Sequence, residues 1–242
     1  MHTTIDEIND GIYRISTFVA DAGLSFNQIL VTGDEPFLFH TGMRSLFPLV
    51  ADAVARVLPV DELRWISFGH VEADECGSVN QWLAAAPAAQ VAFGAVGCMV
   101  SVNDMVDREP RALSDNETLD LGGKRLRYLA TPHVPHGWDA GVFYEEVTGT
   151  LLCGDLFTQM GDGPAATDTS PMDATIAAED AFGYSCLAPT TVATVERLAG
   201  LEPTTLALMH GPAHRGRAST WLRELASSYA GRVATKVSTF PV

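Results

Sequence analysis

Four short apolar stretches in this sequence each end directly before a loop that carries histidine or aspartate. The stretches cover residues 63–68, 126–130, 151–153 and 205–209. The loops after them contain, among other residues, His70, His133, His136, Asp155 and His210. Short apolar runs bounded by turn signals are typical of buried strands, and α/β proteins place much of their chemistry in loops that a rigid scaffold positions. The pattern therefore favours an α/β fold with a polar site built from strand-end loops.

The rest of the chain divides into two sets of elements, each rich in strands first and helical afterwards. The first set predicts strands at 12–18, 26–31 and 37–39 and helices at 46–58 and 78–86. The second set predicts hairpins with turns at 121–124 and 148–149 and helices at 174–186, 190–201 and 219–229. We expect two sheets packed face to face with helices outside. We also expect residues 1–242 to form a single domain, because a chain of this length can bury a proper core.

The composition narrows the possible partners. Lys and Arg number 15 and Asp and Glu number 30, which gives a formal net charge of −15 at pH 7. A surface this acidic repels nucleic acid and anionic membranes, so we expect neither as a partner. No apolar run approaches the roughly 20 residues that span a bilayer, and the first residues do not read as a signal peptide. The cysteines, which form no CxxC pair, are expected to be reduced thiols in a cytoplasmic protein.

The densest group of polar residues follows the apolar stretch at 63–68. His70, Glu72 and Asp74 alternate there with small or apolar residues. In an extended backbone, side chains two positions apart point the same way, so three possible metal ligands would converge. The alternative for this segment alone is a solvated acidic loop with one chance histidine, because Asp and Glu usually mark the surface. The other strand ends favour a metal site, because five of the seven histidines lie in these segments.

These motifs together resemble the metallo-β-lactamase superfamily over nearly the whole chain. The generic HxHxDH motif corresponds to residues 70–75 (HVEADE), and the HxExD form is similar to the diiron domain of flavodiiron proteins and related stand-alone oxygen-binding diiron proteins. Further similarities lie at residues 25–30 (SFNQIL), 136–139 (HGWD), 154–157 (GDLF) and 210–212 (HGP). The resemblance implies a four-layer αββα sandwich, with two mixed sheets between outer helices.

The resemblance also implies a ligand set for two iron ions. One iron would take His70, Glu72 and His136, the second would take Asp74 and His210, and Asp155 would bridge them. Three carboxylates with three imidazoles suit iron or manganese, whereas zinc prefers nitrogen and sulfur ligands. Zinc or manganese remain possible substitutes. The second metal has few protein ligands, which leaves a position where O₂ or NO could bind.

Three functions fit this ligand set. The first is a non-haem diiron protein that binds or reduces O₂ or NO. The second is a dinuclear zinc hydrolase of thioesters, esters or lactams, with a metal-bound hydroxide as nucleophile; Glu72 counts against it. The third is a gas sensor coupled to a signalling partner. A reductase needs a separate electron donor, because no flavin-binding or second redox module is visible in the sequence.

Two residues depart from the superfamily pattern. Glu75 replaces the final histidine of HxHxDH, and His40 stands where an aspartate is usual. We expect Glu75 to be a solvated loop acid, with a proton relay as the alternative. We expect His40 to be a buried histidine whose hydrogen bonds are satisfied.

Several residues beside the ligand set have open roles. His133 competes with His136 as a ligand, and the family's spacing to Asp139 favours His136. Asp139 itself is expected to hold a loop or a ligand histidine rather than a metal. His214 lies four residues after His210, but Pro212 favours a loop between them. Trp138 is expected to wall the pocket for the diatomic ligand.

A homodimer is the expected assembly. At a charge of −15 the molecules repel one another, so a dimer needs an apolar patch on the order of 800 Å² per partner. The helical stretch 173–201 contains Phe182, Tyr184 and Leu187, which could supply such a patch. The alternative is that these side chains pack on their own sheet.

Overall fold

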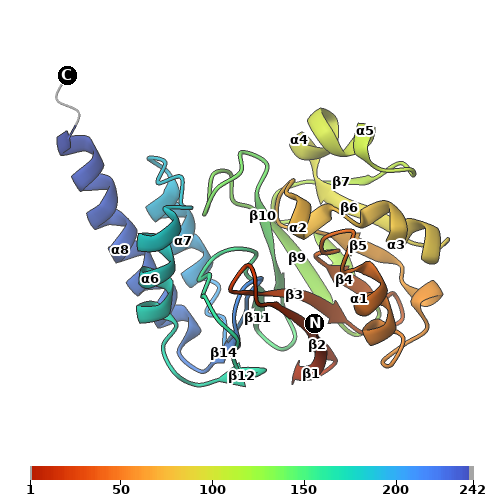
Figure 1. The fold of residues 1–242 in the computed structure, drawn as a ribbon. Helices are drawn as coiled ribbons and strands as arrows, with labels where there is room; N and C mark the ends of the chain where they lie inside the picture. The colour runs from red at the N-terminus through yellow and green to blue at the C-terminus, as the bar shows by residue number, and fades with distance from the viewer. Residues whose placement is uncertain (1, 240–242) are drawn as a thin grey trace.

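Two mixed β-sheets face each other at the centre of the molecule, and helices cover both outer faces (Figure 1). The computed structural model describes residues 2–239 of the chain. Helices α1 to α5 lie on one side of the sheets, and α6, α7 and α8 lie on the other (Figure 1). The α/β sandwich implied by the sequence motifs is confirmed.

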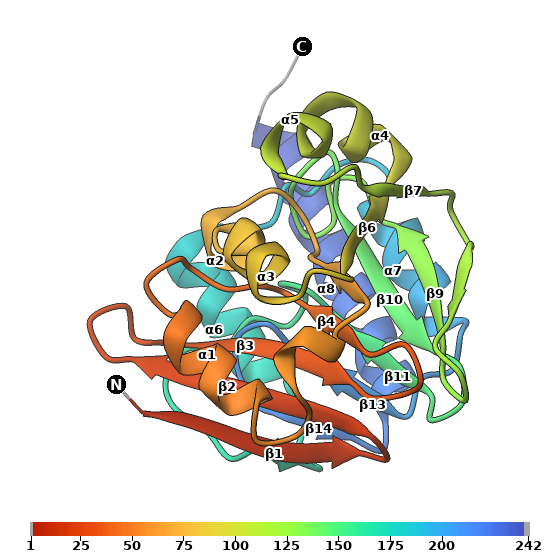
Figure 2. The ribbon, with the colours of Figure 1, turned by 90° about the vertical axis from the view of Figure 1, so that its right-hand side faces the viewer.

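The first sheet has the strand order β1-β2-β3-β4-β5-β6-β7. It comprises β1 (Thr3–Asn9), β2 (Ile12–Val19), β3 (Leu24–Val31), β4 (Phe37–Phe39), β5 (Trp65–Ser67), β6 (Gln90–Gly94) and β7 (Arg111–Leu113). Pairing is antiparallel from β1 to β4 and parallel from β4 to β7. Helices α1 (Phe47–Val54) and α3 (Val79–Ala85) cover its outer face (Figure 2). Short helical segments join these elements: η1 (Val60–Glu62), α2 (Ala73–Cys76), α4 (Ala95–Gly97), η2 (Cys98–Val102) and α5 (Asn103–Met105).

The second sheet has the strand order β12-β14-β13-β11-β10-β9-β8. It comprises β8 (Thr118–Asp120), β9 (Arg125–Ala130), β10 (Gly141–Glu145), β11 (Thr150–Leu152), β12 (Ala166–Thr167), β13 (Thr205–Ala207) and β14 (Ala213–Arg215). The helices on its outer side are α6 (Met172–Phe182), α7 (Thr191–Ala199) and α8 (Ala218–Thr239). Both predicted hairpins are confirmed, since β8 pairs with β9 and β10 pairs with β11.

Alternation along the strands explains the four layers. Successive side chains of a strand point to opposite faces. In β3, Leu30 packs in the cluster under α1 and α3, whereas Ile29 and Val31 belong to the cluster between the sheets. In β11, Leu152 lies between the sheets, and Leu151 packs in the cluster that contains residues of α7 and α8. Each of the three buried clusters therefore fills one interface between layers.

Some elements differ from the sequence prediction. Strand β6 and the helical segments from Ala95 to Met105 were not predicted. Helix α6 ends at Phe182 instead of continuing to residue 186, because Gly183 adopts a left-handed conformation with φ 58°, which ends many helices. Helix α8 extends well beyond the predicted end at residue 229.

No helix in residues 2–239 combines the length and the apolar character that crossing a bilayer requires. None of the four cysteines forms a disulfide: Cys76, Cys98 and Cys153 are buried, and Cys186 is exposed.

Candidate metal centre

Hydrogen bonds just beyond the strand ends bring the polar loops together. Gly141 at the start of β10 donates its backbone N–H to Gly69, at 2.8 Å, which joins the two sheets beside His70. Met209 donates to the carbonyl of Gly154, at 3.0 Å, and so places the loops of His210 and Asp155 side by side. The candidate residues meet because the sheets are linked where their strands end.

The first group of candidate ligands consists of His70, Glu72 and His136. Glu72 Oε2 lies 2.7 Å from His70 Nε2 and 3.2 Å from His136 Nε2. The two imidazole rings are nearly perpendicular, with centroids 4.5 Å apart. Together with Asp155, these residues offer ligand atoms that all lie within 4.8 Å of one another.

The second group consists of Asp74 and His210. His210 Nε2 lies 3.4 Å from Asp74 Oδ2. The other ring nitrogen of His210, Nδ1, is 2.9 Å from the carbonyl of Ser25. Asn27 Nδ2 donates to the carbonyls of Leu208 and Gly211, at 2.9 and 2.8 Å, on either side of this histidine. Strand β3 therefore fixes the His210 loop and turns its Nε2 into the cluster.

Asp155 stands between the two groups. Its Oδ2 lies 3.3 Å from His136 Nε2 and 3.9 Å from His70 Nε2, whereas its Oδ1 lies 3.5 Å from His210 Nε2. One carboxylate thus presents one oxygen to each group. Its side chain is only 8% exposed, so it is held inside the protein.

The HxExD segment differs from the expected extended conformation. Glu72 is extended, with φ −139° and ψ 152°, but α2 begins at Ala73. Asp74 therefore lies in the first turn of a helix, and the prediction that three alternate side chains share one strand face was wrong. The turn of α2 carries Asp74 toward His210 instead of toward His136.

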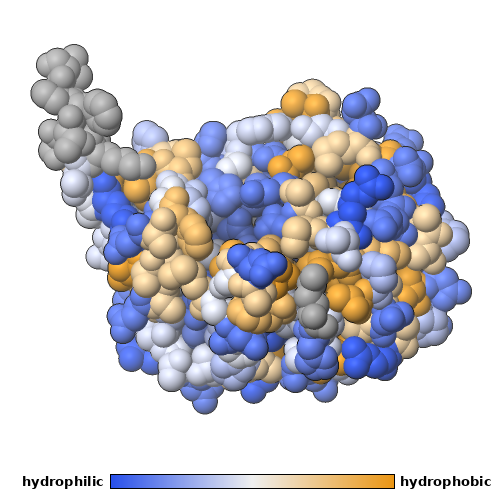
Figure 3. Space-filling view, in the orientation of Figure 1, coloured by the Kyte–Doolittle hydropathy of each residue, from blue (hydrophilic) through white to orange (hydrophobic). Residues whose placement is uncertain are grey.

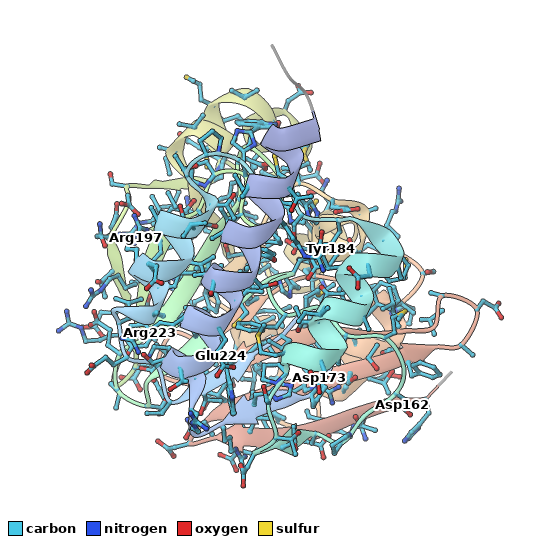
Figure 4. The ribbon with its side chains drawn as sticks, turned by 90° about the vertical axis from the view of Figure 1, so that its left-hand side faces the viewer. Asp162, Asp173, Tyr184, Arg197, Arg223 and Glu224 are labelled. Carbon is cyan, nitrogen blue, oxygen red and sulfur yellow. The ribbon has the colours of Figure 1, made fainter. Side chains whose placement is uncertain are left out.

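The cluster lies at one side of a hollow of about 180 Å³. In Figure 3 the surface is hollowed between the α6–α8 side and the side of α2 to α5, and hydrophilic residues line its floor. Leu24, Thr158, Phe182 and Tyr184 complete the wall. Tyr184 lies between α6 and α8 (Figure 4), and its ring is 6.2 Å from that of His136. These wall residues come from other parts of the chain, and the sequence did not indicate that they line the site.

The surroundings favour positive charge at the cluster. Burial opposes protonation of His70, but Glu75, Glu72 and Asp155 outweigh it and raise the pKa of His70 to about 12. For His210, the carboxylates of Asp74 and Asp155 similarly outweigh burial and raise the pKa to about 9. The hydrogen bond from His70 holds the pKa of Glu72 near 2. Burial, followed by the charge of Glu75, raises the pKa of Asp155 to about 6.

The donor set fits metal cations. Among the described residues, Asp74 Oδ1, Asp155 Oδ1 and His136 Nδ1 are buried and have no hydrogen-bond partner. Buried polar atoms are normally hydrogen-bonded, and a cation held by Asp155 Oδ1, which lies 3.5 Å from His210 Nε2, would satisfy that carboxylate oxygen. Carboxylate oxygens with imidazole nitrogens suit iron and manganese.

Neighbouring candidates lie apart from the cluster. His133 is exposed. His214 is buried and uses both ring nitrogens elsewhere, with Nδ1 2.8 Å from the carbonyl of Thr169 and Nε2 2.7 Å from Gln159 Nε2. Trp138 is 42% exposed and lines a different hollow, so the prediction that it walls the site was wrong. Asp139 holds the His70 loop as predicted, because its Oδ2 accepts the backbone N–H of Val71 at 3.0 Å.

Glu75 and His40, the two departures from the superfamily pattern, face each other. Both are fully buried, and His40 Nε2 lies 3.5 Å from Glu75 Oε1. The prediction of a solvated loop acid at Glu75 was therefore wrong. His40 is buried as predicted, but its Nε2 has no hydrogen-bond partner within the described residues.

Comparisons with known proteins agree with this architecture. A family model described as ODP family beta lactamase matches residues 24–211. The curated protein "Putative diflavin flavoprotein A 1" of Nostoc sp. is 29% identical over 210 residues, which cover 83% of this chain and 35% of that protein. The chain thus spans about a third of the length of this relative.

Solved structures show the same fold. Rubredoxin oxygen:oxidoreductase from Desulfovibrio gigas superposes with a TM-score of 0.81 at 20% identity, covering 96% of this chain and 62% of that one. The metal-soaked Flv1 flavodiiron core from Synechocystis sp. PCC6803 gives a TM-score of 0.75 at 23% identity, covering 96% of this chain and 61% of that one.

Proposed function

Because this chain belongs to the family described as ODP family beta lactamase, we propose that it holds two iron ions and binds O₂ or NO at them. The observation that carries the proposal is the position of Asp155. Its two oxygens face two separate sets of candidate ligands, as a carboxylate that bridges two metals requires.

The proposed ligand set follows the two groups. His70, Glu72 and His136 would hold one iron, Asp74 and His210 would hold the second, and Asp155 would be shared between them. When bound, an iron pair supplies a coordination position for a diatomic molecule and up to two electrons. Zinc and manganese are possible substitutes for iron in such a set.

The protein contributes the surroundings of the ligand. The hollow beside Asp74 and His210 is small, and Leu24, Phe182 and Tyr184 form apolar parts of its wall. Such a wall limits the water that reaches a bound diatomic molecule. The second group has fewer protein ligands than the first, so we place the diatomic molecule on that side.

A reductase of O₂ or NO needs electrons from elsewhere. The matched relative is named a diflavin flavoprotein and is about three times as long as the part it shares with this chain. We therefore propose that a separate electron-donating protein serves this site if it reduces O₂ or NO. If the site only binds the gas, a signalling protein takes that place.

A zinc hydrolase is the weaker alternative. In the HxHxDH motif the final histidine supplies an additional nitrogen ligand, and Glu75 replaces that histidine here. Glu75 turns its carboxylate toward His40 and His70 Nδ1 and away from the cluster. Glu72 adds another oxygen where the histidine-rich motif has nitrogen. Both replacements move the ligand set away from the preference of zinc.

We also propose that residues 1–242 form one domain, and that the protein acts in the cytoplasm as a homodimer. Phe182 is 53% exposed and Tyr184 and Leu187 are partly buried, so this segment offers some apolar surface for a second copy. Light scattering at low salt, where charge repulsion is least screened, gives twice the chain mass if the dimer forms and the chain mass if it does not.

The substitution Asp155→Ala tests the proposed bridge. Removing the shared carboxylate should reduce iron from two per chain to one or none, as measured by metal analysis of purified protein. Asp162→Ala is the matched control, because Asp162 is an exposed acid in the loop that follows and should keep two irons. Two irons retained by the Asp155→Ala variant would contradict the proposed bridge.

A further inference from the structure

We propose that Glu75 is a positioning residue for His70: its Oε2 accepts the backbone N–H of His70, and its Oε1 faces the ring Nδ1. This leaves Nε2 of His70 free to bind a metal. The inference rests on the proposed function only in taking His70 as a ligand.

The contacts of His70 are divided between the two sides of its ring. On one side, Glu75 Oε2 accepts the backbone N–H at 2.7 Å, and Glu75 Oε1 lies 3.3 Å from Nδ1. On the other side, Nε2 faces Glu72 and Asp155. A proton held on Nδ1 by Glu75 fixes the tautomer in which Nε2 carries a lone pair.

The position of Glu75 is fixed from several directions. Thr41 donates both its backbone N–H and its hydroxyl to the carbonyl of Glu75, at 2.6 and 3.0 Å. His40 Nε2 lies 3.5 Å from Oε1. The carboxylate also depends on Gly69, because a Cβ there would lie 2.9 Å from Oε2 and 3.0 Å from Oε1. A Cβ closer than 3.0 Å to another heavy atom forces one of the two to move. The absence of a side chain at Gly69 therefore makes room for the Glu75 carboxylate.

A carboxylate is required here because it offers an acceptor to each of two donors. A glutamine has one acceptor oxygen and one donor nitrogen, so it can serve either the backbone N–H or Nδ1–H of His70, but not both. Partners of this kind orient metal-binding histidines, and their loss typically costs about 10–100-fold in metal affinity.

The substitution Glu75→Gln tests the inference, with zinc as a diamagnetic probe in place of iron. Chelator competition should show zinc affinity lowered by about 10–100-fold. In ¹H–¹⁵N spectra of the zinc-loaded protein, the Nδ1–H signal of His70 should be protected from exchange in the wild type and lost in the variant. Glu179→Gln is the matched control. It makes the same change at a buried glutamate that accepts a hydrogen bond from Ser185, outside the cluster, and should change neither readout.

A second variant moves the Glu75 carboxylate without replacing Glu75 itself. Gly69→Ala should displace Glu75 and reproduce both effects, which keeps the test decisive if Glu75→Gln does not fold. The inference fails if either folded variant keeps wild-type zinc affinity, or loses affinity while the protected Nδ1–H signal remains. A wild-type protein that binds zinc but no iron would contradict the proposed function alone, and one that binds neither would contradict both.

Discussion

Glu72 is the most exposed of the six candidate ligands, with 53% of its side chain accessible. It nevertheless joins two of them, because its Oε2 faces both His70 and His136. These imidazoles hold the pKa of Glu72 near 2, so the carboxylate is ionised at neutral pH. An exposed anionic oxygen at this position is the feature that most distinguishes the cluster from a histidine-rich zinc site.

We predict that Glu72 selects iron over zinc. The substitution Glu72→His replaces an oxygen ligand with nitrogen, so zinc affinity relative to iron should rise by about tenfold or more. Competitive loading with both metals, followed by metal analysis, measures the ratio. Glu62→His, which places a histidine at an exposed site away from the cluster, should leave the ratio unchanged. An unchanged ratio in the Glu72→His variant would show that metal preference is set elsewhere.

At the residue scale, the sequence indicated the candidates but not all their neighbours. The strand-end loops indicated where candidate ligands gather, the family resemblance selected the six residues among them, and the structure places these residues in adjacent loops. Their role as metal ligands stays a prediction. Glu75 could not be assigned from the sequence, because its burial depends on Thr41 and Gly69, which meet it only in the folded chain. Tyr184 follows a helix of the second half and carries no local signal.

At the element scale, long or clearly bounded elements could be predicted and short ones could not. Strand β6 lies in an alanine-rich stretch where a short apolar run cannot be told from a helix by periodicity. Helix α2 has only four residues, too few to show any period. Its direction decides where Asp74 points. It brings Asp74 Oδ2 to 3.4 Å from His210 Nε2, beside the residue with which the family resemblance grouped it.

We predict that α8 holds the second layer of helices in place through its buried face. Leu222 is fully buried in the cluster between this helix and the second sheet. Leu222→Ala should lower the free energy of unfolding by about 2–5 kcal/mol, through lost burial and the cavity left behind. Glu224, two residues after Leu222, is exposed (Figure 4). Glu224→Ala should therefore change the free energy of unfolding by less than about 0.5 kcal/mol. Chemical denaturation of both metal-free variants makes the comparison, and equal stabilities would contradict this packing.

At the scale of the whole molecule, the two sheets act as a frame that brings distant strand ends to one site. His70 lies beyond β5 of the first sheet, and Asp155 and His210 lie beyond β11 and β13 of the second. The formal charge of −15 favours partners with a basic surface. We therefore expect a separate electron donor or signalling protein to present basic residues to this chain.

The most direct test of the account is metal analysis combined with the optical spectrum of the anaerobically reduced protein as O₂ is admitted. We predict two irons per chain and a visible charge-transfer band that develops on exposure to O₂. Two zincs per chain, with ester hydrolysis and no spectral change, would contradict the proposed diiron function and support the hydrolase.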